Sequence, residues 1–366
     1  MDDPRGSRIR RAAHELNVVH QSLRHSNLTS HLALTPATSF ERLEKSRIGS
    51  PETAGSQETF LYLAYGSNLC AATFRGARGI KPLSEVNVVV PSLSLTFDLS
   101  GTPYNEPCFA NTAKRTISSN GIHDNETSEK TPLLASSKSS LHWDKGLVGV
   151  VYEVTSSDYA HIIATEGGGA SYDDILVDCY ELAADPTIPV PTVPTSKSFK
   201  AHTLFAPIDN NDSMRREPNY AQPSPRYLNL ITSGADEHSF PNEYRAYLNS
   251  LQPYIITSKR QELGRYIFLM TWGPILGLLF GLANSGKGED DEGKWPEWMV
   301  KLLHTLFTGI WWSYDHVMKQ RFGDGERTEE DRGDKSGKGR SETDTKKSKS
   351  SSKYDQENEK IGWDMV

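Results

Sequence analysis

Cysteine is scarce in this chain of 366 residues, which contains three: Cys70, Cys108 and Cys179. An odd number cannot pair completely, and the spacing matches no set of metal ligands, so neither a disulfide framework nor a zinc site is indicated. Free cysteines usually pack as small apolar side chains. The cysteine content therefore suits a reducing compartment.

The chain also lacks an excess of either charge. Its 40 Lys and Arg residues and 47 Asp and Glu residues give a formal net charge of -7, with both signs spread along the length. Nucleic-acid-binding proteins show a basic patch or stripe, so a nucleic-acid partner is not expected.

The sequence carries no signal for a cofactor or a metal. No Cys/His cluster could hold zinc, and no glycine-rich loop ends in the Lys-Ser or Lys-Thr of a nucleotide site. The glycine run at 167–169 lacks the strand-to-helix order of a dinucleotide site. We therefore expect neither a cofactor nor a metal.

The N-terminus does not read as a secretory signal. The chain opens with Met1, Asp2 and Asp3, where a signal peptide carries positive charge, and no apolar run follows. Arginines and hydroxyl residues further on resemble a mitochondrial transit peptide only weakly, because acidic residues interrupt them.

Composition leaves one segment that can form a core. Residues 1–57 and an insert at 121–140 have too few apolar residues to bury much surface, and we predict both to be disordered. Residues 319–366 are dense in charge, which predicts a solvated, disordered tail. The intervening segment, 58–257, is long enough for one domain.

This core segment mixes predicted strands with two predicted helices. Short runs of β-branched and aromatic residues predict strands at 60–64, 86–90, 93–97, 147–154, 175–182 and 199–205. Ser157 and Asp158 can cap a helix that runs to Thr165, and a second helix opens at Pro241. Strands with interspersed helices indicate an α+β domain.

At two places an apolar run ends abruptly in small residues, and both places indicate a chemical role. The strand-like run at 60–64 leads into the turn 65–69, which contains Gly66, and successive backbone N–H groups in such a turn can converge on one oxygen atom. Further on, a predicted helix ends at Glu166 and the glycines 167–169. The first turn can hold an oxyanion, and the carboxylate of the second can move a proton.

With these two segments, the chain resembles the γ-glutamylcyclotransferase family, in a fungal-type form with an apolar C-terminal extension. Members carry a Tyr-Gly-Ser-Asn-Leu turn, as at 65–69, and a catalytic Glu in a Glu-Gly turn, as at 166–167. The blocks 223–227 and 234–244 resemble the C-terminal helical segment of the family. The resemblance covers roughly residues 60–255, and it implies a small mixed β-barrel flanked by helices.

The resemblance implies an enzyme that cyclises a γ-glutamyl compound to 5-oxoproline and releases an amine. Glu166 would be the catalytic base, and its place at the end of a helix is expected to raise its pKa. The substrate-binding residues carried over from the family are Tyr65, Gly66, Ser67, Asn68, Leu69 and Tyr172. A glutamate solvated on a glycine-rich loop is the ordinary alternative for Glu166.

Two places depart from the family pattern. Thr203 stands where some relatives carry a substrate-facing tyrosine, and the segment 101–107 has no clear counterpart. Glu106 in that segment is a rival carboxylate to Glu166, although a solvated turn residue is its more ordinary role.

A further segment, 264–318, lies beyond the predicted core. Residues 266–283 carry no charge and reach about the minimum length for crossing a bilayer, so we expect a transmembrane helix, with a buried helix as the alternative. Basic residues before this run place its N-terminal side in the cytoplasm. The stretch 298–314 is amphipathic, which fits the membrane interface, a second crossing or a helix docked on the protein.

The sequence thus predicts a γ-glutamylcyclotransferase on the cytoplasmic face of a membrane, with a soluble cytoplasmic enzyme as the alternative. A non-catalytic binding module of the same fold, tethered to a membrane, is the main rival function. A third possibility makes the C-terminal half a membrane-interaction device that carries the core. The expected partner is a small γ-glutamyl molecule, and γ-glutamyl amino acids, glutathione and glutathione adducts all stay open.

Overall fold

The computed structural model describes residues 35–47, 59–115, 141–166, 172–206, 220–283 and 296–329. By its internal contacts the chain divides into residues 1–37 and residues 38–366, and every helix and strand among the described residues belongs to the second unit.

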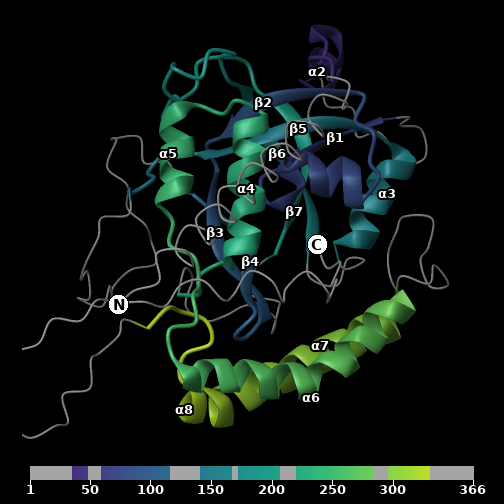
Figure 1. Ribbon diagram of the computed structural model, residues 1–366. Helices are drawn as coiled ribbons and strands as arrows, with labels where there is room; N and C mark the ends of the chain where they lie inside the picture. Colours follow the sequence, from purple (N-terminus) through teal and green to yellow (C-terminus); the bar gives the residue numbers. More distant parts are fainter. Residues whose placement is uncertain are drawn as a thin grey trace, which may run out of the picture. The chain divides into compact units, whose positions relative to one another are not determined.

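Five strands close into a barrel in the order β1-β5-β2-β6-β7 (Figure 1). They are β1 (Thr59–Ala64), β2 (Ser84–Val90), β5 (Leu147–Thr155), β6 (Asp173–Glu181) and β7 (Phe199–Phe205). β1 runs parallel to β7, whereas every other neighbouring pair is antiparallel. The predicted α+β domain with a small mixed barrel is therefore confirmed.

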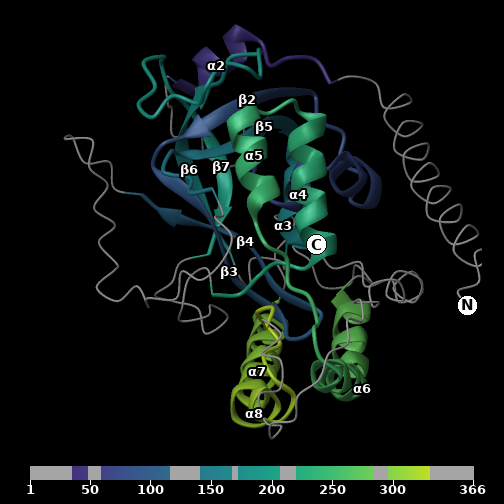
Figure 2. The same cartoon turned by 60° about the vertical axis from the view of Figure 1, so that its left-hand side comes forward.

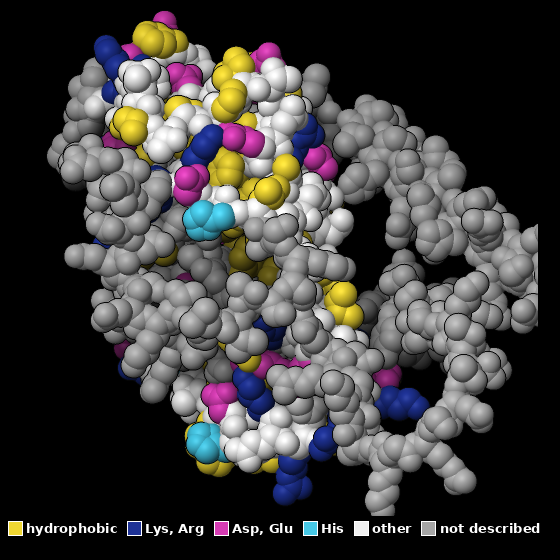
Figure 3. Space-filling model, turned by 90° about the vertical axis from the view of Figure 1, so that its left-hand side faces the viewer, with side chains coloured by type: hydrophobic (Ala, Val, Ile, Leu, Met, Phe, Trp, Pro, Cys, Tyr) yellow, Lys and Arg dark blue, Asp and Glu magenta, His cyan; other side chains and the backbone are white. Residues whose placement is uncertain are grey.

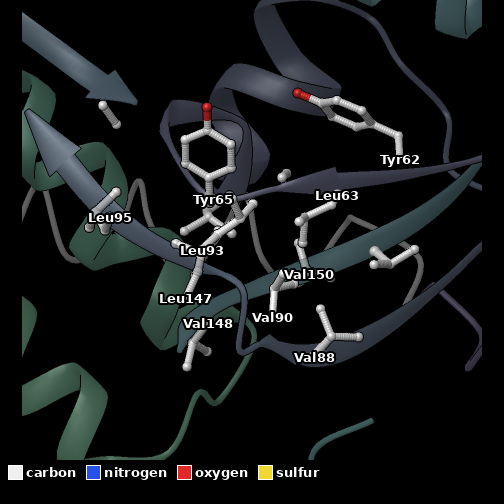
Figure 4. Packing of buried hydrophobic residues seen from close by; sticks show 14 of the residues in the cluster. Tyr62, Leu63, Tyr65, Val88, Val90, Leu93, Leu95, Leu147, Val148 and Val150 are labelled. Atoms are coloured by element: carbon white, nitrogen blue, oxygen red, sulfur yellow. The ribbon is translucent and has the colours of Figure 1, made fainter. Parts of the chain in front are cut away.

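The side chains of β1 divide between a hydrophobic core and a polar face. Leu63, Val88 and Val150 are fully buried together, and Figure 4 shows them on one side of β1. The hydroxyl groups of Tyr62, in β1, and of Tyr65, which follows the strand, point to the other side. Tyr62 and Leu63 face opposite ways because successive side chains of a strand alternate, whereas Tyr65 reaches the side of Tyr62 from the turn after β1.

A two-stranded sheet of β3 (Leu93–Thr102) and β4 (Glu106–Lys114) stands beside the barrel. The sequence predicted the first half of β3 and missed β4. Pro107 and Asn111 lie within β4 and are residue types that strands rarely contain. β4 forms because its neighbour β3 pairs with it over most of its length.

Three helices flank the barrel: α3 (Ser156–Thr165), α4 (Pro225–Glu237) and α5 (Asn242–Ser250). The predicted helix up to Thr165 is confirmed, but its cap is Thr155, whose hydroxyl accepts from the Asp158 N–H at 3.1 Å. Figures 1 and 2 show α4 and α5 side by side. A Cβ at Gly234 would lie 2.4 Å from the Leu69 Cβ, so only glycine lets α4 pack directly on the turn after β1.

Two predictions of disorder need correction. Residues 40–47, within the predicted disordered segment 1–57, form α2 (Phe40–Arg47), and Arg42 from this helix binds Glu153 of β5. Residues 319–329, within the predicted tail, are ordered because Glu326 is fully buried and its carbonyl accepts from the Gln222 N–H at 2.9 Å. The remaining parts of these segments, and the insert 121–140, lie outside the described residues.

The C-terminal segment contains α6 (Lys259–Ala283), α7 (Glu297–Ser313), a π-helical turn, η4 (Tyr314–Met318), and α8 (Lys319–Phe322). Within the described ranges, no helix combines the length and the apolar character that a membrane crossing needs, so the predicted span at 266–283 is wrong. Phe268 and Leu276 of this run are instead buried in a cluster with Ile310 and Trp311 of α7. Hydropathy alone could not distinguish packing of this kind from insertion.

Candidate active site

The turn after β1 and the end of α3 meet in one pocket. The pocket holds about 340 Å³ of empty space, which includes solvent at its open side. Its lining residues are Tyr62, Tyr65, Gly66, Ser67, Asn68, Ala110, Glu166, Tyr172, Leu204 and Tyr227.

Most of the residues predicted for the site lie in this pocket, and Leu69 does not. Leu69 is buried in the hydrophobic core, and its backbone N–H donates to the Gly66 carbonyl at 3.1 Å. Residues 67–69 form a single 3₁₀ turn, which uses that N–H internally. Leu69 therefore shapes the turn but offers no donor to a ligand.

Gly66 leaves the backbone accessible from the pocket, because it has no side chain. A Cβ at this position would lie 3.1 Å from the Tyr227 hydroxyl and 3.5 Å from the Ala110 Cβ. A side chain here would therefore push against two other pocket walls.

Asn68 connects the turn to the carboxylate. Its Nδ2 donates to the Tyr62 hydroxyl and to Glu166 Oε1, both at 2.9 Å. Asn68 is buried and Glu166 is the C-cap residue of α3, so the amide fixes the position of the carboxylate relative to the turn.

Arg78 is the charged partner of Glu166. Its Nη2 lies 2.7 Å from Glu166 Oε1, and the two side chains are only 4% and 8% exposed. Arg78 Nη1 also donates to the Thr165 hydroxyl, so the guanidinium binds two consecutive residues at the end of α3. No described residue donates to Glu166 Oε2.

Buried phenols form the remaining walls. The Tyr65 hydroxyl donates to the Leu204 carbonyl at 2.7 Å, and the Tyr227 hydroxyl accepts from the Ala110 N–H at 3.1 Å. Burial raises the pKa of Tyr65, Tyr172 and Tyr227. These phenols therefore stay neutral at neutral pH and can act as hydrogen-bond donors.

Comparison with known proteins identifies the family. The chain is 34% identical over 267 residues to the γ-glutamyl cyclotransferase gliK of Aspergillus fumigatus, covering 72% of this chain and 88% of that protein. It is 33% identical over 269 residues to the γ-glutamyl cyclotransferase aclK of Aspergillus oryzae, covering 72% and 89%. The chain belongs to the γ-glutamyl cyclotransferase family.

Two further matches accompany these. The family model described as the AclK C-terminal domain matches residues 258–319 of this γ-glutamyl cyclotransferase family member, a range that contains α6, α7 and η4. A solved γ-glutamyl cyclotransferase structure is 20% identical and covers 56% of this chain and 96% of its own, with a TM-score of 0.36.

The two departures from the family pattern lie outside the pocket. Glu106 accepts from the Ser224 hydroxyl at 2.7 Å and from Arg226 Nε at 2.8 Å, so the rival carboxylate is held in a separate ion pair. Thr203 is fully buried and its hydroxyl donates to the Leu63 carbonyl. The neighbouring residue Leu204 lines the pocket instead.

Sequence reasoning missed five residues of the site: Tyr62, Arg78, Ala110, Leu204 and Tyr227. Tyr62 stands in the predicted strand 60–64 that leads into the turn. Tyr227 stands in the block 223–227 that supported the family resemblance, so that block was the available signal. The other three come from separate elements and reach the site only through the tertiary fold. Across the described ranges, no group of three or more His, Cys, Asp or Glu residues is placed to hold a metal ion.

Proposed function

We propose that this chain is a γ-glutamyl cyclotransferase in which Glu166 moves the proton and the turn at 66–68 holds the substrate oxygen. The observation that carries the proposal is that Glu166 and this turn line the same pocket, joined by the hydrogen bond from Asn68 to Glu166. The names of the two curated relatives support the same class of reaction.

The substrate brings its own nucleophile. Glu166 takes a proton from the α-ammonium group, and the freed amine attacks the γ-carbonyl carbon to close a five-membered ring. The carbonyl π electrons move onto oxygen, and the ring nitrogen, which is now positively charged, loses its second proton to water. The electrons then return as the bond to the leaving nitrogen breaks, and Glu166 gives its proton to that nitrogen, so the products are 5-oxoproline, the free amine and one proton in solution.

Backbone N–H groups stabilise the charge that develops on oxygen. The N–H groups of Ser67 and Asn68 have no acceptor among the described residues, and both residues line the pocket. Donors placed for the oxyanion contribute on the order of 3 kcal/mol each to lowering a barrier. The same turn can bind the α-carboxylate of the substrate in place of the oxyanion.

The pocket is open to solvent on one side. A substrate whose γ-glutamyl end binds in the pocket can therefore leave its other end outside. Accordingly γ-glutamyl amino acids, glutathione and glutathione adducts all remain candidate substrates.

Measuring 5-oxoproline from a panel of γ-glutamyl compounds tests the function. The full chain should release 5-oxoproline, and Glu166→Gln should retain substrate binding but lose turnover, because an amide cannot accept the ammonium proton. Binding of a γ-glutamyl compound by the wild type without any 5-oxoproline would support the rival, a non-catalytic binding module.

We also infer that α6 and α7 contact a lipid surface without crossing it. The side chains of Met270, Leu278, Trp298 and Trp312 are 59–79% exposed, an unusual number of large apolar groups for one segment. Figure 3 shows Lys and Arg side chains at the lower end of the face that it presents. Aromatic residues with basic neighbours favour an anionic interface such as the cytoplasmic leaflet.

Flotation with vesicles of anionic and of neutral lipid tests this second proposal. The full chain should float with anionic vesicles, and Trp298→Ser with Trp312→Ser should abolish flotation, whereas Val193→Ser, at an exposed site outside the segment, should not. Failure to float would contradict the proposal, and a concentration-dependent dimer would assign the surface to a second copy.

A further inference from the structure

We propose that Arg78 is a positioning residue for the catalytic carboxylate: it holds one oxygen of Glu166 so that the other is left for the substrate. The inference rests on the proposed cyclotransferase function. Arg78 does not line the pocket, so it acts through Glu166.

The geometry assigns different tasks to the two oxygens of Glu166. Oε1 accepts from Arg78 Nη2 at 2.7 Å and from Asn68 Nδ2 at 2.9 Å. Oε2 receives no hydrogen bond from any described residue, although Glu166 lines the pocket. A carboxylate gripped at one oxygen by two donors cannot rotate freely, so the proton of the substrate meets Oε2 in a fixed direction.

Arg78 is itself anchored on both sides of the site. Its backbone N–H donates to the Thr73 carbonyl at 2.9 Å, at the end of the π-helix η2 (Ala72–Ala77). Its Nη1 donates to the Thr165 hydroxyl. The guanidinium therefore ties the segment after the 66–69 turn to the last residues of α3, and the fork geometry of arginine makes both contacts at once.

A purely structural role explains these contacts less well. Burying an ion pair seldom adds stability over a packed apolar pair, because both charges lose their hydration. In addition, Arg78 Nε is buried and has no hydrogen-bond partner among the described residues, and leaving a buried donor unpaired lowers stability. A fold that needed only to join η2 and α3 could do so with apolar side chains.

The cation also bears on the return of the proton. A guanidinium beside a protonated carboxyl favours release of that proton, here to the leaving nitrogen. Arg78 thus assists the second half of the reaction without touching the substrate.

Kinetics of Arg78 variants over a range of pH test the inference. Arg78→Met should lower kcat by roughly 10- to 100-fold with a smaller change in KM, because alignment is lost but the binding turn is not. The acid limb of the kcat/KM profile should move to higher pH, since the cation no longer favours the carboxylate. Arg78→Lys should restore the position of the limb but only part of kcat, because lysine lacks the fork.

A matched control is available in the same segment. Arg75 is also largely buried, but its ion pair at 3.1 Å is with Glu85, which does not line the pocket, and not with Glu166. Arg75→Met should leave the kcat and the acid limb within a few-fold and a few tenths of a pH unit of wild type. The thermal unfolding temperatures of Arg75→Met, Arg78→Met and Arg78→Lys show whether a loss of activity comes from misfolding or from misalignment of the Glu166 carboxylate.

The outcomes are distinct. If the wild type is active and Arg78→Met matches its kcat and pH profile, the role of Arg78 is refuted and the proposed function stands. Equal effects of Arg75→Met and Arg78→Met on kcat and on the acid limb would likewise refute a specific role. If the wild type forms no 5-oxoproline from any γ-glutamyl compound, the proposed function fails and this role fails with it.

Discussion

Two glutamates of this protein, Glu153 and Glu166, each pair with an arginine, yet their environments differ. Glu153 lies in the middle of the ladder between β1 and β5, and its Oε1 accepts from Arg42 Nε at 3.0 Å and from the Thr59 hydroxyl at 2.9 Å. Its Oε2 accepts from the Ser84 hydroxyl at 2.8 Å. Both oxygens of Glu153 are therefore occupied.

Glu166 has donors on one oxygen only, and it lies just after α3 rather than within a strand. A carboxylate with donors on both oxygens is held in place by the fold and has less access to a substrate proton. A carboxylate held at one oxygen is fixed and still reactive. The arginine partner alone does not distinguish the two roles, whereas the occupancy of the second oxygen does.

The sharpest test of this contrast replaces each glutamate by glutamine. Glu166→Gln should lose cyclotransferase activity by about 10²-fold or more, because the amide cannot accept a proton. Glu153→Gln should stay within a few-fold of wild type. The measurement is 5-oxoproline formation at saturating substrate. Activity of Glu166→Gln close to wild type would remove Glu166 from the mechanism.

A second test addresses the other half of the site. Gly66→Val should reduce both activity and substrate binding, by roughly 10- to 100-fold in kcat/KM, because its Cβ would lie 3.1 Å from the Tyr227 hydroxyl and displace the substrate. Gly76→Ala is the matched control, since its Cβ would meet its nearest neighbour at 3.8 Å. Normal turnover by a folded Gly66→Val would show that the turn does not hold the substrate.

The predicted site residues that line the pocket come from short contiguous segments, the turn 65–68 and the end of α3, together with Tyr172. The turn and Glu166 could be singled out because each stands where an apolar run ends in glycine, and a local pattern of this kind can be read without the tertiary structure. Leu69 does not line the pocket, and a 3₁₀ turn uses its N–H. Arg78 was not predictable, since an arginine after a helical turn gives no sign of the α3 end that it contacts.

The fold, too, was predictable where the local sequence decides the structure and not where tertiary contacts decide it. The barrel strands are rich in β-branched residues and were predicted, whereas β4 depends on pairing with β3 and was not. The apolar run at 266–283 was misread because hydropathy records how apolar a helix is but not what covers it. Phe268 is 1% exposed against α7 and its neighbours, whereas Met270 is 79% exposed.

The third test measures the free energy of unfolding, to which Glu153 should contribute more than Glu166. Glu153→Gln should lower the free energy of unfolding by about 1–3 kcal/mol, because it weakens a set of charge-assisted hydrogen bonds and leaves Arg42 without its partner charge. Glu166→Gln should change it less, since its carboxylate is only half satisfied. Chemical denaturation of both variants checks this order, and a larger loss for Glu166→Gln would reverse it.

The smallest expected effect is the pH dependence of the contribution that Glu153 makes to the free energy of unfolding. Burial by itself raises the pKa of Glu153, but hydrogen bonds from Ser84, Thr59 and Arg42 outweigh it and hold the pKa below its usual value. A carboxyl whose pKa is lower in the folded state contributes stability above its unfolded pKa, about 4.3, and this contribution disappears as the pH falls through the folded pKa. The difference in unfolding free energy between wild type and Glu153→Gln should therefore be constant near neutral pH and shrink below about pH 4. Unfolding in denaturant at pH 7 and at pH 3 measures it. A difference that grows on acidification would mean that Glu153 binds its proton more tightly in the folded protein, and the contrast with Glu166 would lose its physical basis.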